Sequence, residues 1–294
     1  MRLSPFTFSR WVSAGALQVA LLVFWGAGCG RKNSSEATYS LPARNQCFGI
    51  VNGQASMEFP AVVVIMTSSL ARCTGTFVGT NTLVTAAHCV ENTQNGNSQI
   101  LLDDCANRRS IMIDAEKIFT AGYHAEDYGN AVSSKHDDLF EKDIAVVLVP
   151  DGTAPALMAL SPKPVAADDQ LVMMGFGSDK PSANVLPGDD KGFEYYTKRK
   201  GRAKATADVN SDPTVLVQAL ASDSYISLGD SGGPLLLNDR LAGVASFTID
   251  AKEAEVLPIS GWTNIFSPIV RAVFVEAKKN GARFEGWDEA YGAR

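Results

Sequence analysis

The sequence predicts an all-β protein with one α-helix near its C-terminus. From Ile50 onward, short apolar and β-branched runs are separated by Gly, Asn and Asp, which is typical of a β-sandwich or β-barrel. These runs do not alternate with helical patterns, which argues against a parallel α/β sheet. The runs occupy residues 61–66, 74–78, 82–85, 111–113, 144–149, 171–174, 215–220, 235–237 and 241–247.

The predicted helix follows the last of these runs. Ser267 is a suitable N-cap, Pro268 fits the first helical turn, and Gly281 can end the helix. Apolar residues recur within it at i, i+3, i+4 and i+7, namely Val270, Val273, Phe274 and Ala277. They form one apolar stripe, which we expect to pack against the β-structure.

The composition is that of a globular protein and excludes several other classes. The 294 residues are 46% hydrophobic and 20% charged, which excludes collagen-like, low-complexity and wholly disordered chains. With a net charge of −6, no basic face dominates, so we expect no nucleic-acid partner. The basic run at residues 198–202 is interpreted as a solvated strand edge or loop without an assigned function.

The first residues carry the features of a secretory signal peptide. Arg2 and Arg10 precede an apolar stretch at residues 11–24, and small residues follow it. A transmembrane anchor is the alternative, but Ser13 and Gln18 interrupt the short apolar stretch. We therefore expect an exported protein.

The end of the signal resembles a bacterial lipobox, because residues 27–29 are Ala-Gly-Cys. In that motif the cysteine, here Cys29, is acylated and becomes the first residue of the mature protein. Gly26 departs from the aliphatic residue that is usual there, so secretion without a lipid stays open. We expect a signal peptide over residues 1–28, a tether or propeptide over residues 29–49, and a periplasmic or cell-surface lipoprotein, alternatively a secreted protein.

Export places the five cysteines in an oxidising compartment, where disulfides are expected rather than catalytic thiols. Lipidation of Cys29 would leave four, enough for two bridges: Cys47, Cys73, Cys89 and Cys105. No CxxC spacing occurs and the chain has only three histidines, so we predict no zinc site. No motif calls for another metal or an organic cofactor.

Three residues far apart in the sequence suggest nucleophilic catalysis. Ser231 lies within Gly-Asp-Ser-Gly-Gly-Pro at residues 229–234, where glycines allow a sharp turn that presents the hydroxyl and nearby N–H donors. His88 ends one apolar run, and Asp143 begins another. A serine needs a neighbouring base, and that base needs an orienting acceptor. Taken singly, each residue has a structural interpretation as a turn residue, a core histidine or a strand cap.

Together these stretches resemble the chymotrypsin/trypsin family of serine endopeptidases. The matching segments are residues 50–53, 85–89, 143–145, 175–177, 229–234, 246–247 and 262–264. The order His, Asp, Ser is that of this family and differs from subtilisin-like and α/β-hydrolase enzymes. The resemblance implies two packed six-stranded antiparallel β-barrels with a C-terminal α-helix, a protease domain over residues 50–294, and protein or peptide substrates.

The resemblance also implies roles for individual residues. His88 would act as general base for Ser231, and Asp143 would orient the imidazole. The N–H groups of Gly229 and Ser231 would form the oxyanion hole. Ser246 would support Asp143, and the backbone there would pair with an extended substrate. The alternative is a catalytically silent binding or regulatory protein on the same fold.

Cys73 and Cys89 flank the histidine run as they do in the family, so a bridge between them is implied. Cys47 and Cys105 are then left over. Our hypothesis is that they pair and tether the segment before Ile50 to the rest of the protein.

The segment at Ile50 resembles the new N-terminus of an activated zymogen of this family. Its α-amino group would form a buried ion pair with Asp230, beside the nucleophile. Such a pair would be lost only as alkaline pH deprotonates the amine. Because Gly49 precedes it, a trypsin-like activator would not cut there, so the sequence does not identify the processing enzyme, and self-processing would need an unusual specificity.

The expected specificity pocket departs from the family pattern. Tyr225 stands six positions before Ser231, where Asp would select Arg or Lys, and Thr248 stands where an open pocket has Gly. Ser227 replaces the cysteine of the pocket disulfide. We expect a shallow pocket, flanked by Ser246 and Thr248, that accepts small or medium apolar side chains.

Overall fold

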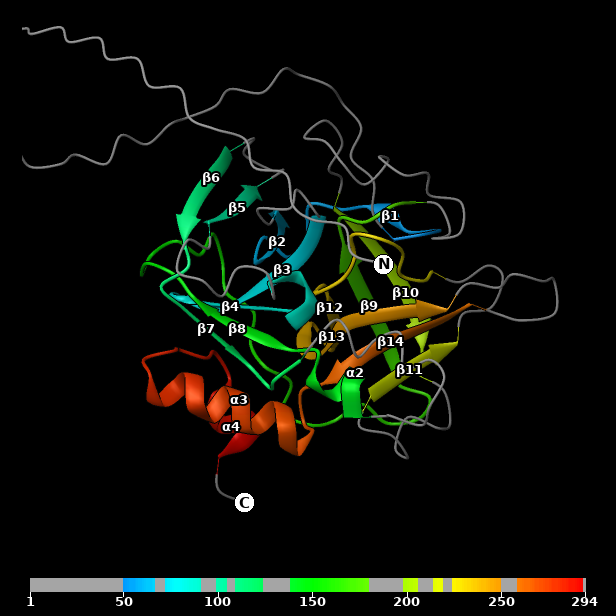
Figure 1. The fold of residues 1–294 in the computed structure, drawn as a ribbon. Helices are drawn as coiled ribbons and strands as arrows, with labels where there is room; N and C mark the ends of the chain where they lie inside the picture. Colours follow the sequence, from blue (N-terminus) through cyan, green and yellow to red (C-terminus); the bar gives the residue numbers. More distant parts are fainter. Residues whose placement is uncertain are drawn as a thin grey trace, which may run out of the picture. The chain divides into compact units, whose positions relative to one another are not determined.

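The computed structural model describes residues 50–66, 72–90, 99–104, 109–123, 138–179, 198–205, 214–218, 224–249 and 258–292. The predicted signal peptide and tether, with Cys29 and Cys47, lie outside these residues, as does Cys105. The described residues form two antiparallel β-sheets with helices near the C-terminus (Figure 1), which confirms the predicted all-β fold class. No helix among them is long and apolar enough to cross a membrane.

The first sheet is built from the N-terminal half of the described chain. Its strand order is β6-β5-β2-β3-β4-β8-β7, and every neighbouring pair is antiparallel. The strands are β2 (Val62–Met66), β3 (Arg72–Gly79), β4 (Thr82–Thr85), β5 (Gln99–Asp104), β6 (Arg109–Asp114), β7 (Lys117–Thr120) and β8 (Ala145–Leu148). Only Ala115 and Glu116 separate β6 from β7, although these strands lie at opposite edges. This bent segment therefore closes the sheet into a barrel.

The second sheet contains most of the remaining strands. Its order is β1-β10-β9-β12-β13-β14-β11, again antiparallel throughout. The strands are β1 (Gln54–Ala55), β9 (Gln170–Gly175), β10 (Arg199–Lys204), β11 (Thr214–Gln218), β12 (Pro234–Leu237), β13 (Arg240–Ile249) and β14 (Ile259–Asn264). Its core contains Ile50, Met173 and Trp262, all fully buried.

Each sheet has seven strands in the described part of the chain, where the resemblance implied six. In the first sheet, the bend at residues 115–116 divides one long strand into β6 and β7. In the second sheet, the additional strand is β1, a two-residue strand contributed by the segment that follows Ile50. Both differences therefore leave the predicted two-barrel architecture intact.

The basic run at residues 198–202 binds the N-terminal segment instead of forming a solvated edge. It lies mostly in β10, between β9 and β1. Lys198 is only 7% exposed, and its Nζ donates to the carbonyl of Phe59 at 2.8 Å. Arg199 donates to the carbonyl of Gly53 at 2.8 Å, and Lys200 pairs with Glu58 at 2.6 Å. These cations thus hold residues 53–59 against the second sheet.

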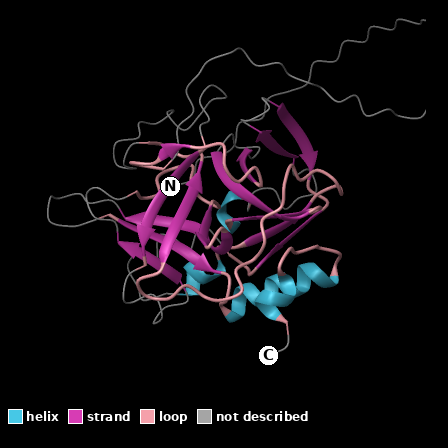
Figure 2. Ribbon diagram, turned by 180° about the vertical axis from the view of Figure 1, so that it is seen from behind, coloured by secondary structure: helices cyan, strands magenta, loops and turns pink. Residues whose placement is uncertain are grey.

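The predicted C-terminal helix is confirmed as α3 (Pro268–Lys279). The Ser267 hydroxyl accepts the Val270 N–H at 3.2 Å, and the predicted apolar stripe is buried. The helix is capped by Asn280, one residue before the expected Gly281, whose φ of +100° suits glycine. Helix α3 packs against β7 and β8. Figure 2 shows the longest helix along the lower edge of the strands.

Two shorter helices were not predicted. Helix α2 (Asp138–Lys142) directly precedes Asp143, and α4 (Trp287–Tyr291) follows α3. Aromatic rings join the last two helices: Phe274 of α3 lies edge-on to Tyr291 of α4, with ring centroids 6.2 Å apart. Five-residue helices have too few turns for an apolar periodicity to indicate them.

Candidate active site

His88 and Asp143 are joined by two hydrogen bonds. The ring Nδ1 of His88 lies 2.8 Å from Oδ2 of Asp143, and the main-chain N–H of His88 donates to Oδ1 at 3.0 Å. The Asp143 side chain is 2% exposed and that of His88 is 28% exposed. Because a carboxylate only accepts, the proton of the neutral ring belongs on Nδ1, which leaves Nε2 as the basic nitrogen.

Strand register brings these two residues to the same end of the first sheet. Thr85, the last residue of β4, pairs with Ala145, the first residue of β8. His88 follows Thr85 in a short 3-10 turn (Ala87–Cys89), and Asp143 precedes Ala145 by two residues. Both β4 and β8 are fully buried, so the strand pairing fixes the position of the pair.

A second group of contacts orients this pair. The Ser246 hydroxyl, from β13 of the second sheet, donates to Oδ2 of Asp143 at 2.6 Å. The Thr263 hydroxyl lies 3.2 Å from the carbonyl of Asp143. The ring of Tyr123 lies 6.3 Å from that of His88 and is buried. The sequence analysis included Thr263 in the matching segment 262–264 but gave it no role, and it did not single out Tyr123, which no local motif marks.

Glycines shape the loop that carries Ser231. Gly229 and Gly232 have φ angles of +95° and +80°, a region that disfavours other residues. A Cβ atom on Gly232 would lie 2.1 Å from Oγ1 of Thr85 and 2.2 Å from the carbonyl oxygen of Thr74. The missing side chain therefore lets this loop contact β3 and β4, close to the His88 turn.

Thr74 fastens the Ser231 loop to the first sheet. Its N–H donates to the carbonyl of Ser231 at 2.7 Å, and its hydroxyl donates to the carbonyl of Gly229 at 3.0 Å. Its own carbonyl accepts the Thr85 hydroxyl at 2.9 Å. Thr74 is fully buried. The sequence analysis missed it, and its position next to Cys73 was the only available signal.

Two main-chain donors flank the Ser231 side chain. Within the described part of the chain, neither the N–H of Gly229 nor that of Ser231 donates a hydrogen bond. The Ser231 hydroxyl likewise makes no hydrogen bond to another described residue. The Ser231 carbonyl lies 3.8 Å from Sγ of Cys89, the residue after His88. Without substrate, catalytic hydrogen bonds are often long or poorly aligned.

The bridge between Cys73 and Cys89 is present, as the resemblance implied. It has an S–S distance of 2.01 Å and ties the start of β3 to the His88 turn. The two sulfurs lie within 4.8 Å of a His88 ring nitrogen. Because they are bonded to each other, they are not thiolate ligands for a metal. The pairing of Cys47 with Cys105 stays a prediction, since both lie outside the described residues.

Ile50 and Asp230 meet in the interior beneath the Ser231 loop. The main-chain N–H of Ile50 donates to Oδ2 of Asp230 at 3.3 Å. Ser227 donates to the same oxygen at 2.9 Å, and Gly177 donates to Oδ1 at 2.7 Å. Burial raises the pKa of Asp230 to about 7, although these N–H groups and the positive charge of Arg72 act in the opposite direction.

Ile50 itself is fully buried and has a φ of +54°. A β-branched residue is strained there, because its side chain crowds the preceding carbonyl.

The residues predicted for the specificity pocket lie at one end of the second sheet. The main chain of Tyr225 pairs with that of Val51, at 3.0 and 3.3 Å. Beside it, the N–H of Ile226 donates to the Ser260 hydroxyl at 3.1 Å. The Thr248 hydroxyl donates to the carbonyl of Ile259 at 3.3 Å. These bonds engage polar groups near the residues predicted for the pocket, and no carboxylate takes part in them.

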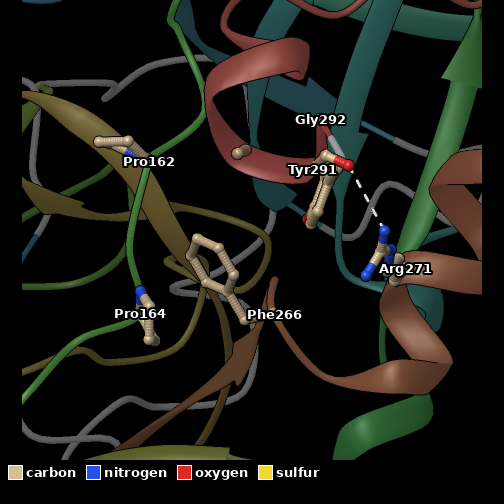
Figure 3. A pocket seen from close by; sticks show the side chains of 7 residues that line it. Pro162, Pro164, Phe266, Arg271, Tyr291 and Gly292 are labelled. Carbon is tan, nitrogen blue, oxygen red and sulfur yellow. Dashed lines mark hydrogen bonds between the residues drawn. The ribbon is translucent and has the colours of Figure 1, made fainter. Parts of the chain in front are cut away.

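A separate hollow of about 300 Å³ lies against the C-terminal helices (Figure 3). It is lined by Pro162, Pro164, Phe266, Arg271, Ala290, Tyr291 and Gly292. Arg271 donates to the carbonyl of Tyr291 at 3.4 Å. None of the residues around His88 and Ser231 lines this hollow, so we do not regard it as the active site.

The two antiparallel barrels, the C-terminal helix and the Cys73–Cys89 bridge define a protein of the serine protease fold class. The family model for trypsin matches residues 50–267. The chain therefore belongs to the trypsin family.

Curated relatives agree with this assignment at low identity. The snake venom serine protease CL2 of Trimeresurus stejnegeri is 27% identical over 201 residues, covering 65% of this chain and 72% of that protein. The trypsin of Saccharopolyspora erythraea is 27% identical over 218 residues, covering 67% of this chain and 86% of that protein.

Solved structures show the same fold. Human heparin binding protein has a TM-score of 0.57 at 17% identity, covering 79% of this chain and 98% of its own. A scabies mite inactivated protease paralogue has a TM-score of 0.56 at 17% identity, covering 80% of this chain and 100% of its own. At this identity, both structures support the fold alone.

Proposed function

We propose that this protein is an exported serine endopeptidase that hydrolyses peptide bonds in protein or peptide substrates through Ser231, His88 and Asp143. The observation that carries the proposal is the hydrogen-bonded pair of Asp143 and His88, held beside a glycine-framed serine. Family membership supports the reaction class, and the geometry supports the assignment of residues. No metal or organic cofactor is required for this chemistry.

The reaction would proceed through an acyl-enzyme. His88 Nε2 removes the Ser231 hydroxyl proton as Oγ attacks the substrate carbonyl carbon, and Asp143 stabilises the imidazolium. The N–H groups of Gly229 and Ser231 donate to the oxyanion. His88 then protonates the leaving amine, the C–N bond breaks, and the same residues activate a water that releases the acid product.

We propose further that the protein is made as a zymogen and is activated by cleavage before Ile50. The cut would turn the Ile50 nitrogen into an α-ammonium group, 3.3 Å from the Asp230 carboxylate in the described arrangement. A buried carboxylate gains most from a cation, so the new ion pair would fix the Ser231 loop. Gly49 at the cut excludes an activating protease that requires Arg or Lys.

For the substrate, we propose small or medium apolar side chains on the acyl side of the cleaved bond. Tyr225 and Thr248 add bulk, and the Ser260 hydroxyl bonds to Ile226 within the same wall. A cleavage profile on a peptide library measures this preference directly.

For location, we propose that residues 1–28 are removed as a signal peptide and that Cys29 carries a lipid anchor. Intact-mass analysis of the exported protein tests both steps, with Cys29→Ser as the control that cannot be acylated at this position. A mature chain that begins elsewhere, or that lacks a lipid, would exclude the anchor and leave plain export.

An active-site fluorophosphonate probe tests the catalytic proposal. An enteropeptidase recognition sequence inserted directly before Ile50 in the full chain allows the cut to be made at will. We expect labelling at Ser231 after the cut, none in Ser231→Ala, and much less before the cut or in His88→Ala. A cut and folded protein that is not labelled at Ser231 would instead support the catalytically silent binding or regulatory protein.

A further inference from the structure

Arg72 lies directly against the glycine that we propose as an oxyanion donor. A Cβ atom built on Gly229 would lie 2.8 Å from Nε of Arg72 and 3.4 Å from its Nη2. The absence of a side chain at Gly229 is therefore what admits the guanidinium. Arg72 is only partly exposed, and its positive charge reaches Asp230, whose pKa it lowers.

The surroundings of Arg72 indicate which side of the cleaved bond it would contact, the acyl half or the leaving-group half of the substrate. Arg72 precedes Cys73, which is bonded to Cys89 next to His88. In the proposed reaction, His88 delivers a proton to the leaving amine, so the leaving half passes this disulfide. The acyl half would pair with β13, whose Ser246 donates to Asp143. Arg72 is thus beside the half that departs.

A guanidinium recognises a particular chemical group well. Its planar set of donors matches the two oxygens of a carboxylate, and a partly buried site screens the interaction less than open water does. We propose that Arg72 is a specificity-determining residue that favours substrates with an acidic side chain within two residues of the cleaved bond, on its leaving-group side. This inference rests on the proposed peptidase function.

Paired peptides test the inference on the cut full-length protein. The two peptides differ only by Glu or Gln at the two positions after the cleaved bond. We expect kcat/KM to be about fivefold higher for the Glu peptide, as for an ion pair near the surface, and the difference to shrink as salt rises.

Three variants assign the preference to Arg72. In Arg72→Gln the two peptides should be cut equally, and in Arg72→Lys part of the preference should remain. Arg202→Gln is the matched control, because Arg202 is exposed on β10. If Arg72→Gln lowers kcat/KM equally for both peptides, Arg72 supports the loop or the oxyanion and the inference is wrong.

A binding measurement keeps the inference independent of turnover. Fluorescence anisotropy with the Ser231→Ala protein should show about fivefold tighter binding of the Glu peptide, and Arg72→Gln on that background should remove the difference. Equal binding of both peptides overturns the inference. Glu-dependent binding without turnover by the unsubstituted protein supports it and overturns the proposed function instead.

Discussion

The main-chain nitrogen of Ile50 lies 3.3 Å from Oδ2 of Asp230, although 180 positions separate the two residues in the sequence. Asp230 directly precedes Ser231, and it is fully buried. The charge state of the Ile50 nitrogen therefore acts on the residue next to the proposed nucleophile. An amide and an ammonium group at this point predict opposite dependences of protein stability on pH.

In the uncut chain, we predict that stability falls as pH rises from about 4 to about 7. The Ile50 nitrogen is then a neutral amide, and burial raises the pKa of Asp230 from 3.8 to about 7. Between these values the native state keeps a proton that the unfolded state has released, which costs stability on the order of a few kcal/mol above about pH 7. Urea unfolding across this range measures the slope. Asp230→Asn should lack this contribution, and an unchanged slope in that variant would contradict the prediction.

After the cut, we predict a different dependence of protein stability on pH. Pairing with the α-ammonium group favours the charged carboxylate, so the loss of stability between pH 4 and 7 should disappear. A free α-amine has a pKa of about 8, and the ion pair raises it, so stability and activity should be present below that value and lost as alkaline pH removes the proton. A pH–activity profile of the cut protein checks this, with the uncut protein as reference.

Asp143→Asn should lower kcat by about 10⁴-fold with little change in fold, because an amide cannot both orient the ring and stabilise an imidazolium. Ser246→Ala removes only the 2.6 Å hydrogen bond to Oδ2 and should cost far less, about tenfold. Steady-state kinetics on a peptide substrate of both variants give the comparison. Equal losses would show that Asp143 acts mainly through packing.

Gly232→Ala should destabilise the protein much more than Gly152→Ala does. The two glycines have nearly the same φ, +80° and +85°, so the backbone strain of about 1–2 kcal/mol is common to both. A Cβ on Gly232 would lie 2.1 Å from Thr85 Oγ1, whereas nothing lies within 4 Å of one on Gly152. Urea unfolding of the two variants isolates the effect of this contact on the free energy of unfolding. Similar losses of stability in both would mean that the Ser231 loop shifts to accommodate the Cβ atom at no energetic cost.

Replacing both Cys73 and Cys89 by Ala should lower stability by about 3 kcal/mol, the value expected for a closed loop spanning 16 positions. Activity should fall as well, since the bridge restrains the His88 turn. Thermal unfolding and peptide hydrolysis, each compared with the unsubstituted chain, separate the two effects. Full activity in the folded variant would show that β4 and β8 alone hold His88 in place.

The sequence was sufficient to predict a structural feature where the residues that form this feature lie close together in one local motif. The segments around His88, Asp143 and Ser231 end or begin apolar strands, so their neighbours predict both the strands and the positions of the functional groups. The cap at Ser267 and the stripe on α3 were predictable for the same reason. Each of these features is set by residues close together in the chain.

Features that depend on distant partners could not be predicted. The hydroxyl of Thr74 finds its acceptor 155 positions away, and nothing around Thr74 indicates that acceptor. Arg72 has an ordinary strand sequence around it, and only the folded chain brings it to Gly229. The basic run was misjudged because its partners, Gly53, Glu58 and Phe59, belong to a segment that crosses over from the other end of the chain.

Thr74 has a consequence for any attempt to divide the molecule. A fragment ending before β9 would contain both His88 and Asp143, but the N–H of Thr74 and its hydroxyl would lose the carbonyls of Ser231 and Gly229. The complementary fragment would carry the nucleophile with nothing to hold its loop. We therefore expect neither fragment to form the site alone. A chimera that combines halves from two relatives would need to keep this threonine and its two acceptors together.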